Sequence, residues 1–158
     1  MSKASQVLSY VRRVLDSKDW RYELIEGKDA LMMRGLPLDC KLKEFNCTIF
    51  TTEYFCTSYA FISLNADKDC RMAVAEYLMR ANYGLKSGKF EMDFSDGEIK
   101  FALSIDMEDR IGLSESLILQ TLLGTGYRMI NRYGDGLIAV MYGIKSPEDA
   151  IREAESQE

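Results

Sequence analysis

The stretch GLKSGKFEMDFSDGEIKFALSID, residues 84–106, decides how the whole sequence is interpreted. Apolar residues occupy even positions before Asp96-Gly97 and odd positions after it. They are Phe90, Met92 and Phe94, then Ile99, Phe101, Leu103 and Ile105. A two-residue type I′ turn at Asp96-Gly97 explains the change of parity. The stretch therefore predicts a β-hairpin with one apolar face.

The predicted turn also sets the register of this hairpin. It places Phe94 opposite Ile99, Met92 opposite Phe101, and Phe90 opposite Leu103. On the other face it places Asp93 opposite Lys100, a pair of opposite charge. We interpret the hairpin as scaffold that completes a sheet with one buried face.

Helical spacing of apolar residues surrounds the predicted strands. A first helix is indicated by Val7, Tyr10, Val11, Val14 and Leu15. A second follows capping residues in Asn65-Ala66-Asp67, carries Cys70, Ala73, Val74, Tyr77, Leu78 and Ala81, and ends at Gly84. A third, long helix begins after Ser114, with Gly126, Gly134 and Gly136 as points where it bends or breaks. Residues 137–142 are also compatible with a strand. Ser146-Pro147 then begins a short terminal helix.

Two further strand pairs precede the second helix. Residues 21–25 and 30–34 form a weakly marked pair, which Pro37 prevents from continuing as an uninterrupted ladder. Residues 45–50 and 54–62 form a stronger hairpin, rich in aromatic and β-branched residues. A two-residue loop at Thr52-Glu53 would pair Ile49 with Cys56, Cys47 with Ser58, and Phe45 with Ala60.

The order of elements predicts one α+β domain with an antiparallel sheet packed against helices. No internal repeat or linker divides the chain. We expect a single domain over residues 1–145 and an acidic helical tail over 146–158.

Charge and composition exclude several classes of function. The net charge is −5, but residues 146–158 contribute −4 of it, so residues 1–145 carry only −1. A nearly neutral body lacks the basic surface that nucleic-acid binding requires. The N-terminus lacks the apolar core of a signal peptide, and no apolar run reaches the roughly 20 residues of a membrane span. We therefore expect a cytoplasmic protein with no membrane or nucleic-acid partner.

The sequence predicts no catalytic, cofactor-binding or metal-binding residue. It has no histidine, and its four cysteines form no CxxC pair, so we expect reduced, mostly buried thiols. The glycine pairs at 124–126 and 134–136 lack the lysine of a phosphate-binding loop. The carboxylates Asp106, Glu108 and Asp109 lie where solvated charge is expected before a helix.

One aromatic cluster remains without an assigned role. Phe50, Phe55, Tyr59 and Phe61 share the face opposite Phe45, Cys47 and Ile49 in the predicted hairpin. Both faces of this hairpin are thus partly apolar, which indicates cover on both sides or an interface. The cluster is either part of the core or a partner-binding face.

The segment from the second helix to the third resembles the YbjN family of bacterial sensory transduction regulators. The resembling residues are LMRANYGL (78–85), GKFEMD (88–93) and DGEI (96–99). The order of elements extends the resemblance over most of the chain, although residues 20–45 match only in outline.

The resemblance implies a fold similar to that of type III secretion chaperones, α-β-β-β-α-β-β-α, usually dimeric and without catalysis. We expect a non-enzymatic protein-interaction module that is chaperone-like or regulatory, pairs with itself and binds another protein or peptide. The alternatives are a nucleic-acid-linked regulator and an enzyme with an unfamiliar carboxylate site.

Overall fold

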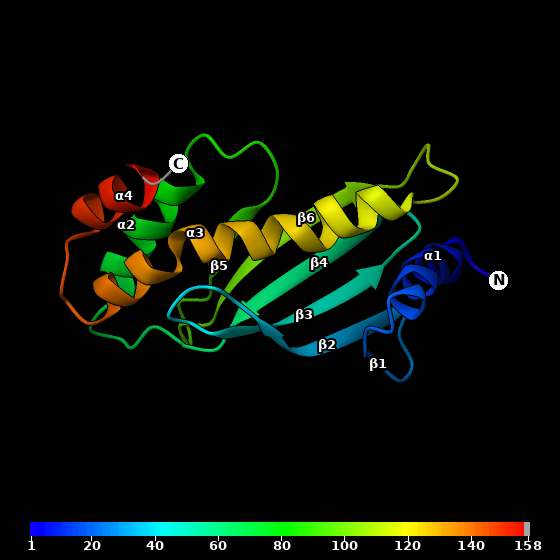
Figure 1. Ribbon diagram of the computed structural model, residues 1–158, viewed down its shortest axis with the longest axis horizontal. Helices are drawn as coiled ribbons and strands as arrows, with labels where there is room; N and C mark the ends of the chain where they lie inside the picture. Colours follow the sequence, from blue (N-terminus) through cyan, green and yellow to red (C-terminus); the bar gives the residue numbers. More distant parts are fainter. Residues whose placement is uncertain (157–158) are drawn as a thin grey trace.

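The computed structural model describes residues 1–156 and confirms the α+β class; residues 157–158 of the predicted tail lie outside the described part. Six antiparallel strands form one sheet in the order β1-β2-β3-β4-β6-β5 (Figure 1). The strands are β1 (Glu23–Leu24), β2 (Ala30–Pro37), β3 (Glu44–Thr51), β4 (Phe55–Ile62), β5 (Lys89–Met92) and β6 (Ile99–Asp106). The helices are α1 (Lys3–Ser17), α2 (Arg71–Asn82), the π-helix η1 (Leu117–Leu123), α3 (Gly124–Met141) and α4 (Pro147–Ser156).

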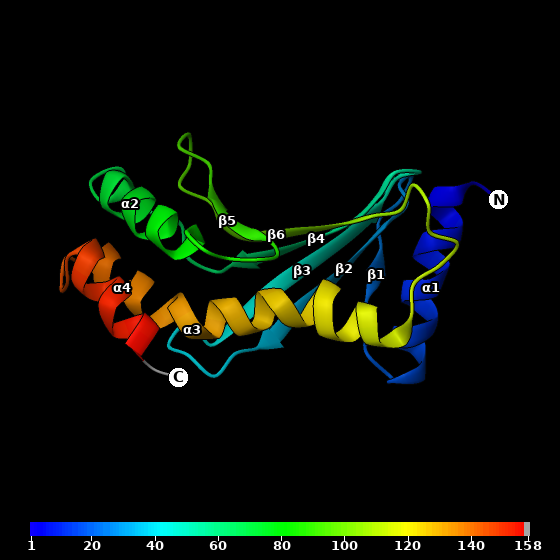
Figure 2. The same cartoon turned by 90° about the horizontal axis from the view of Figure 1, so that it is seen from above.

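One face of the sheet carries the core, and we call it the inner face. Its buried side chains include Leu31, Met33, Phe45, Cys47, Ile49, Cys56, Ala60, Ile99, Phe101 and Leu103. The long helix α3 crosses this face diagonally (Figures 1 and 2). Helix α1 lies at one end of the strands, and helices α2 and α4 pack with α3 beyond the opposite end.

Helix α1 forms as its apolar spacing predicts, whereas the predicted cap of α2 is wrong. The Ser2 hydroxyl accepts the Ser5 N–H and so caps α1. Helix α2 has no side-chain cap. The Asn65 amide donates instead to the Asp96 carbonyl, because the loop after β4 packs against the β5–β6 loop. Gly84 ends α2 with φ of 86°, as expected of a left-handed terminus.

In the first strand pair, β1 is shorter and β2 is longer than the sequence predicts. Strand β1 is only two residues long, whereas β2 runs through to Pro37. Its pairing with β3 shifts between Met33 and Leu36, where Gly35 adopts φ of 63°. This bulge and the edge position of Pro37 are how the strand accommodates a residue that lacks an N–H.

The β3–β4 register differs by two residues from the predicted one. Phe45 pairs with Ile62, and Ile49 pairs with Ser58. The Thr52 N–H donates to the Phe55 carbonyl, so the loop is Glu53-Tyr54 rather than Thr52-Glu53. The Thr52 hydroxyl stabilises this loop by accepting the N–H groups of Tyr54 and Phe55. Because the shift is even, every side chain stays on its predicted face.

The β5–β6 hairpin exists, but its predicted turn and register are wrong. Phe90 pairs with Phe101, and Met92 with Ile99. Lys100 therefore faces Glu91 rather than Asp93. The Asp93 N–H donates to the Glu98 carbonyl, which closes a four-residue loop over residues 94–97. Phe94 consequently lies on this loop, 56% exposed.

Local side-chain and backbone contacts explain the longer loop. The Asp93 carboxylate accepts both the N–H and the hydroxyl of Ser95. The Gly97 carbonyl accepts the Ala66 N–H at 2.8 Å. A Cβ at Gly97 would overlap the Ala66 backbone, and its φ is 77°. Only glycine fits this contact, which joins the hairpin to the segment before α2.

The third helix is continuous, and residues 137–141 are helical rather than a strand. The Ser114 hydroxyl accepts the Leu117 N–H at its start, as predicted. The glycines do not break it. A Cβ at Gly126 would lie 3.2 Å from the Ala60 Cβ, and one at Gly136 would overlap the Tyr77 side chain. These glycines let α3 lie close to the sheet and to α2.

The terminal helix α4 forms at the predicted residues. Ser146 caps it by accepting the Asp149 N–H, and Pro147 occupies its first turn. Ala150 and Ala154 are buried where α4 packs on α2 and α3. Its acidic side chains lie on the exposed side of the helix.

Asn82, part of the segment that carries the family resemblance, connects α2 to β5. Its side-chain amide donates to the Phe90 carbonyl at 2.9 Å, and its Oδ1 accepts the Phe90 N–H at 2.7 Å. The amide thus pairs with the edge of β5 as a short strand would. Its structural role is to satisfy both backbone groups of Phe90.

We expect Gly97→Val to lower the free energy of unfolding by about 2–4 kcal/mol, because a β-branched residue meets both positive φ and the Ala66 backbone. Gly27→Val is the matched control, since Gly27 has φ of 73° but nothing within 4 Å of an added Cβ. Urea denaturation measures both variants. Equal losses would contradict the proposed contact with Ala66.

We expect Asn82→Ala to cost about 1–3 kcal/mol, because it leaves two part-buried backbone groups of Phe90 without a partner. Asn82→Asp should restore the acceptor but not the donor, and so recover only part of the loss. Thermal denaturation of the three proteins checks this order. Stability equal to the native protein in Asn82→Ala would show that water replaces the amide.

Candidate functional site

We call the face of the sheet opposite the core the outer face. Among residues 1–156, no helix lies over its central strands (Figure 2). The register places the following side chains on it: Met32, Thr48, Phe50, Thr57, Tyr59, Phe61, Lys100, Ala102 and Ser104. Arg34 joins them through its ion pair with Glu23, which is paired with Met32. Thr57 and Ser104 satisfy each other through a 2.7 Å hydrogen bond between their hydroxyl groups. A large part of this face is nevertheless aromatic.

Three of the four predicted partner-binding residues meet on the outer face. The ring centroids of Phe50 and Tyr59 lie 5.1 Å apart, and those of Tyr59 and Phe61 lie 6.0 Å apart. All three side chains are half-buried. Phe55 shares the face but lies at the start of β4, 48% exposed and paired with Asp106. The structure thus brings together Phe50, Tyr59 and Phe61.

A lysine adds charge to the aromatic cluster. The Lys100 ammonium lies 3.8 Å from the Tyr59 ring centroid and 5.7 Å from that of Phe61. This cation–π arrangement places the positive charge over the aromatic cluster. Two shallow hollows of about 430 and 390 Å³ flank the cluster, and Tyr59 lines both of them. The outer face therefore has relief as well as apolar area.

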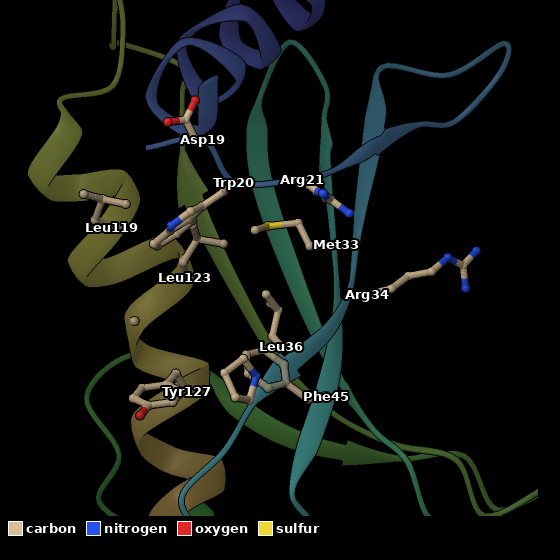
Figure 3. Close-up of a pocket in the computed structure, with 12 residues that line it drawn as sticks. Asp19, Trp20, Arg21, Met33, Arg34, Leu36, Phe45, Leu119, Leu123 and Tyr127 are labelled. Atoms are coloured by element: carbon tan, nitrogen blue, oxygen red, sulfur yellow. The ribbon is translucent and has the colours of Figure 1, made fainter. Parts of the chain in front are cut away.

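The structure also contains an apolar groove that the sequence analysis missed (Figure 3). It has a volume of about 690 Å³ and lies between β2 and the start of the long helix. Its apolar lining is Trp20, Met33, Leu36, Pro37, Phe45, Leu119, Leu123, Gly124 and Tyr127. Asp19, Arg21 and Arg34 supply its polar boundary. The size is typical of a ligand-binding cleft.

Local geometry after α1 places the tryptophan in this groove. Asp19 adopts φ of 57°, and the Trp20 N–H then donates to the Leu15 carbonyl. This reversal directs Trp20 toward the helix (Figure 3), where its side chain remains 44% exposed. The opposite end of the groove is held by Tyr127, whose hydroxyl donates to the Asp39 carboxylate at 2.8 Å.

Hydrogen bonds to side chains of α3 also hold the loop between β2 and β3 against that helix. The Asp39 N–H donates to Asn131 Oδ1, and the Lys41 N–H donates to Asp135 Oδ1, each at 2.8 Å. Side chains of α3 therefore position the loop that follows the groove. No short sequence motif marks these contacts, because they join residues more than 90 positions apart.

The ionisable groups with large pKa shifts are buried rather than exposed in a cleft. Burial raises the pKa of Cys47 and of Cys56 to about 12. It also raises the pKa of Tyr77, whose hydroxyl donates to the Tyr133 carbonyl inside the core. These shifts favour the neutral forms, so the groups act as packing residues rather than as nucleophiles.

The other sequence candidates have structural positions. Asp106 accepts the Glu108 N–H and so forms a local turn. Gly124 begins α3, and Gly134 and Gly136 lie within it, so neither glycine pair forms a loop. Within residues 1–156, no three His, Cys, Asp or Glu side chains gather as a metal site would require. In the same range, no helix combines the length and apolarity of a membrane span.

Comparison with known proteins leaves the family open. A scan against protein-family models gives no match, and a search of curated proteins gives no similar sequence. Any function must therefore be argued from the outer face and the groove themselves.

We expect Cys47 and Cys56 to resist a thiol reagent at pH 8 until the protein unfolds, whereas Cys40 and Cys70, which are partly exposed, react in the native state. Both buried thiols have a folded pKa above their ordinary value of 9.0. Unfolded protein loses these protons first, so stability should fall as the pH rises from about 9 toward 12. Mass spectrometry of the labelled cysteines and urea denaturation at several pH values measure the two effects. Rapid native labelling of Cys47 would contradict the packing.

Proposed function

We propose that this chain is a non-enzymatic protein-interaction module that forms a homodimer through the outer face of its sheet. The observation that carries the proposal is the helix-free outer face with Phe50, Tyr59 and Phe61 at its centre. A chaperone-like or regulatory role in the cytoplasm, as the resemblance to the YbjN family implies, is part of this proposal.

Aromatic side chains on an uncovered sheet favour an interface over a solvated face. Half-buried rings gain further contact area when a partner covers them, and they lose little conformational entropy. The hydroxyl of Tyr59 and the Lys100 ammonium can stay at the hydrated rim while the phenylalanine rings become fully buried.

A second copy of the chain is the partner that the charges of this face favour. Arg34, Lys89 and Lys100 share it with Glu23, Glu91 and Asp106. A face that carries both signs can meet its own copy about a twofold axis without net repulsion. A partner of strong single charge would gain little from such a surface.

The positions of the strongly shifted groups support a non-enzymatic role. Cys47, Cys56 and Tyr77 are neutral at physiological pH and enclosed by the core. Asp19 lies in the groove beside apolar side chains and is its only carboxylate among residues 1–156. A single exposed carboxylate supports binding better than acid–base catalysis.

We expect light scattering to give about twice the monomer mass at micromolar concentration. Replacing Phe55 and Phe61 with serine should convert the dimer to monomer while the circular dichroism spectrum stays native, because both side chains lie on the outer face. Phe94→Ser is the matched control, since Phe94 is 56% exposed on the β5–β6 loop, outside the sheet.

A monomeric native protein would contradict the proposed dimer. Unfolding of the double variant would show that these phenylalanines stabilise the monomer. Loss of the dimer in Phe94→Ser as well would place the interface elsewhere.

A further inference from the structure

The edge of β2 that borders the groove is open. Strand β1 pairs with β2 only at Glu23–Met32 and Leu24–Leu31. On its other side β2 stays paired with β3 as far as Pro37. The segment 33–37 therefore has one neighbouring strand, and four of its residues, Met33, Arg34, Leu36 and Pro37, line the groove (Figure 3). We call this segment the open edge.

The register shows which backbone groups the open edge presents. The Ile25 N–H donates to the Ala30 carbonyl, so even-numbered residues of β2 direct their backbone groups toward β1. Arg34 is the next such residue after Met32, and β1 no longer reaches it. Its N–H and C=O therefore both point outward from the free edge of β2, as one closely spaced pair.

The bulge limits the open edge to this single position. Gly35 follows with φ of 63°, and its N–H donates to Asn46 Oδ1 at 2.9 Å. Pro37 has no N–H at all. A strand added here therefore has one favourable register, with its hydrogen bonds centred on Arg34, rather than a continuous ladder that would promote aggregation.

The two sides of the open edge differ chemically. The groove side is apolar, with Trp20, Leu123 and Tyr127 facing it. The side chains of Arg21 and Arg34 point the other way, away from the helix (Figure 3). Arg34 has only an exposed partner, Glu23 at 3.6 Å, and Arg21 forms no ion pair within residues 1–156. The side opposite the groove therefore presents the exposed guanidinium groups of Arg21 and Arg34, with Glu23 as the ion-pair partner of Arg34.

We propose that the open edge binds an extended segment of another protein, which adds antiparallel to β2 with an acidic residue opposite Arg34 and apolar residues on either side of it. Residues directly opposite in an antiparallel pair share a face, so the acidic side chain meets Arg34 and Arg21. Its two neighbours point into the groove. This inference rests on the proposed role as a protein-interaction module but uses a surface separate from the outer aromatic cluster.

The spacing of the groove fits such a segment. Alternate side chains of a strand are roughly 6.6 Å apart. Leu123 at the end of η1 and Tyr127 in the first turn of α3 are four residues apart, about 6 Å along the helix. Each inward side chain of the bound segment can therefore lie beside one of these two residues. A groove between a strand edge and a helix is a recurring mode of peptide recognition.

The backbone groups of Arg34 favour a polypeptide over an acyl chain with a carboxylate head. Both ligands would supply apolar contacts and a negative charge. Only a polypeptide also supplies an N–H and a C=O at the spacing that completes the pair at Arg34. A bound polypeptide can therefore be distinguished from an acyl chain, because only its binding requires backbone hydrogen bonds to Arg34.

The test begins with random eight-residue segments displayed on phage and the full chain as bait. The expected enrichment is apolar–acidic–apolar. A synthetic peptide of the enriched sequence is then titrated against the protein, and the fluorescence of Trp20, the single tryptophan of the chain, reports binding in the groove.

Methylation of single peptide nitrogens distinguishes strand addition from simple filling of the groove. N-methylation at the acidic residue should weaken binding at least tenfold, because that N–H donates to the Arg34 carbonyl. N-methylation at the residue that follows should have little effect, since that N–H points away from β2. Equal effects at both positions would overturn the proposed pairing.

Protein variants test the two sides of the open edge. Arg34→Glu should change the enriched residue from acidic to basic. Leu123→Glu should abolish binding, whereas Gln120→Glu, an exposed change on η1, should not. Circular dichroism confirms that each variant is folded. An unchanged preference for an acidic residue in Arg34→Glu would overturn the proposal. A change in Trp20 fluorescence on adding dodecanoate, with no peptide enriched by the phage selection, would also overturn it.

The same experiment separates this inference from the proposed dimer. The variant with serine at Phe55 and Phe61 should lose the dimer and keep peptide binding. A native dimer that enriches no peptide would overturn the groove proposal alone. A monomer that binds the peptide would overturn the dimer alone.

Discussion

The close approach of α3 to the sheet is the contact on which the rest of the structure depends. Gly126 lies against Ala60 and Phe101 on the neighbouring strands β4 and β6, and a larger residue there would push the helix away. Further along, Gly134 lies against Cys40 and Gly136 against Tyr77. One helix is thus held against the sheet, the β2–β3 loop and α2 at the same time. Each glycine costs helix propensity, roughly 1 kcal/mol relative to alanine, and close packing offsets that cost.

Both candidate surfaces are consequences of covering six strands with one long helix. Because α3 and α1 lie on the inner face, the aromatic residues of the outer face have no helix to cover them (Figure 2). Because α3 crosses diagonally, its first turns diverge from β2 and leave the groove beside Trp20. The glycines of α3 permit this close position, because a Cβ added at Gly126, Gly134 or Gly136 would lie 3.2 Å or less from a neighbouring side chain.

The two surfaces have different physical character and so suit different partners. The outer face is broad, half-buried and mixed in charge, which suits a second copy of the same chain. The groove is narrow and apolar, with unpaired backbone groups at one position, which suits an extended segment. The bulge at Gly35 and the proline at 37 restrict that edge, and this restriction protects it against indiscriminate strand pairing.

Local patterns in the sequence determined the element types, their order and the face on which the paired strand residues lie. The parity of Phe90 and Ile99 and the spacing of Val7 and Val11 are properties of short segments, and they predict strands and helices whatever surrounds them. The four aromatic residues on the outer face were likewise predicted from alternation. Their faces survived the register errors because each error was an even number of residues.

Tertiary contacts decided the registers, the length of β1 and the groove. The β5–β6 loop is four residues long because Gly97 packs on the Ala66 backbone, a contact across 31 positions that no local signal contains. Trp20 lines a groove only because Asp19 adopts a left-handed conformation and α3 lies opposite. Alternation along a strand is set by the geometry of its own backbone. The position of one strand relative to another, or of a helix above a sheet, depends on packing between residues that are distant in the chain.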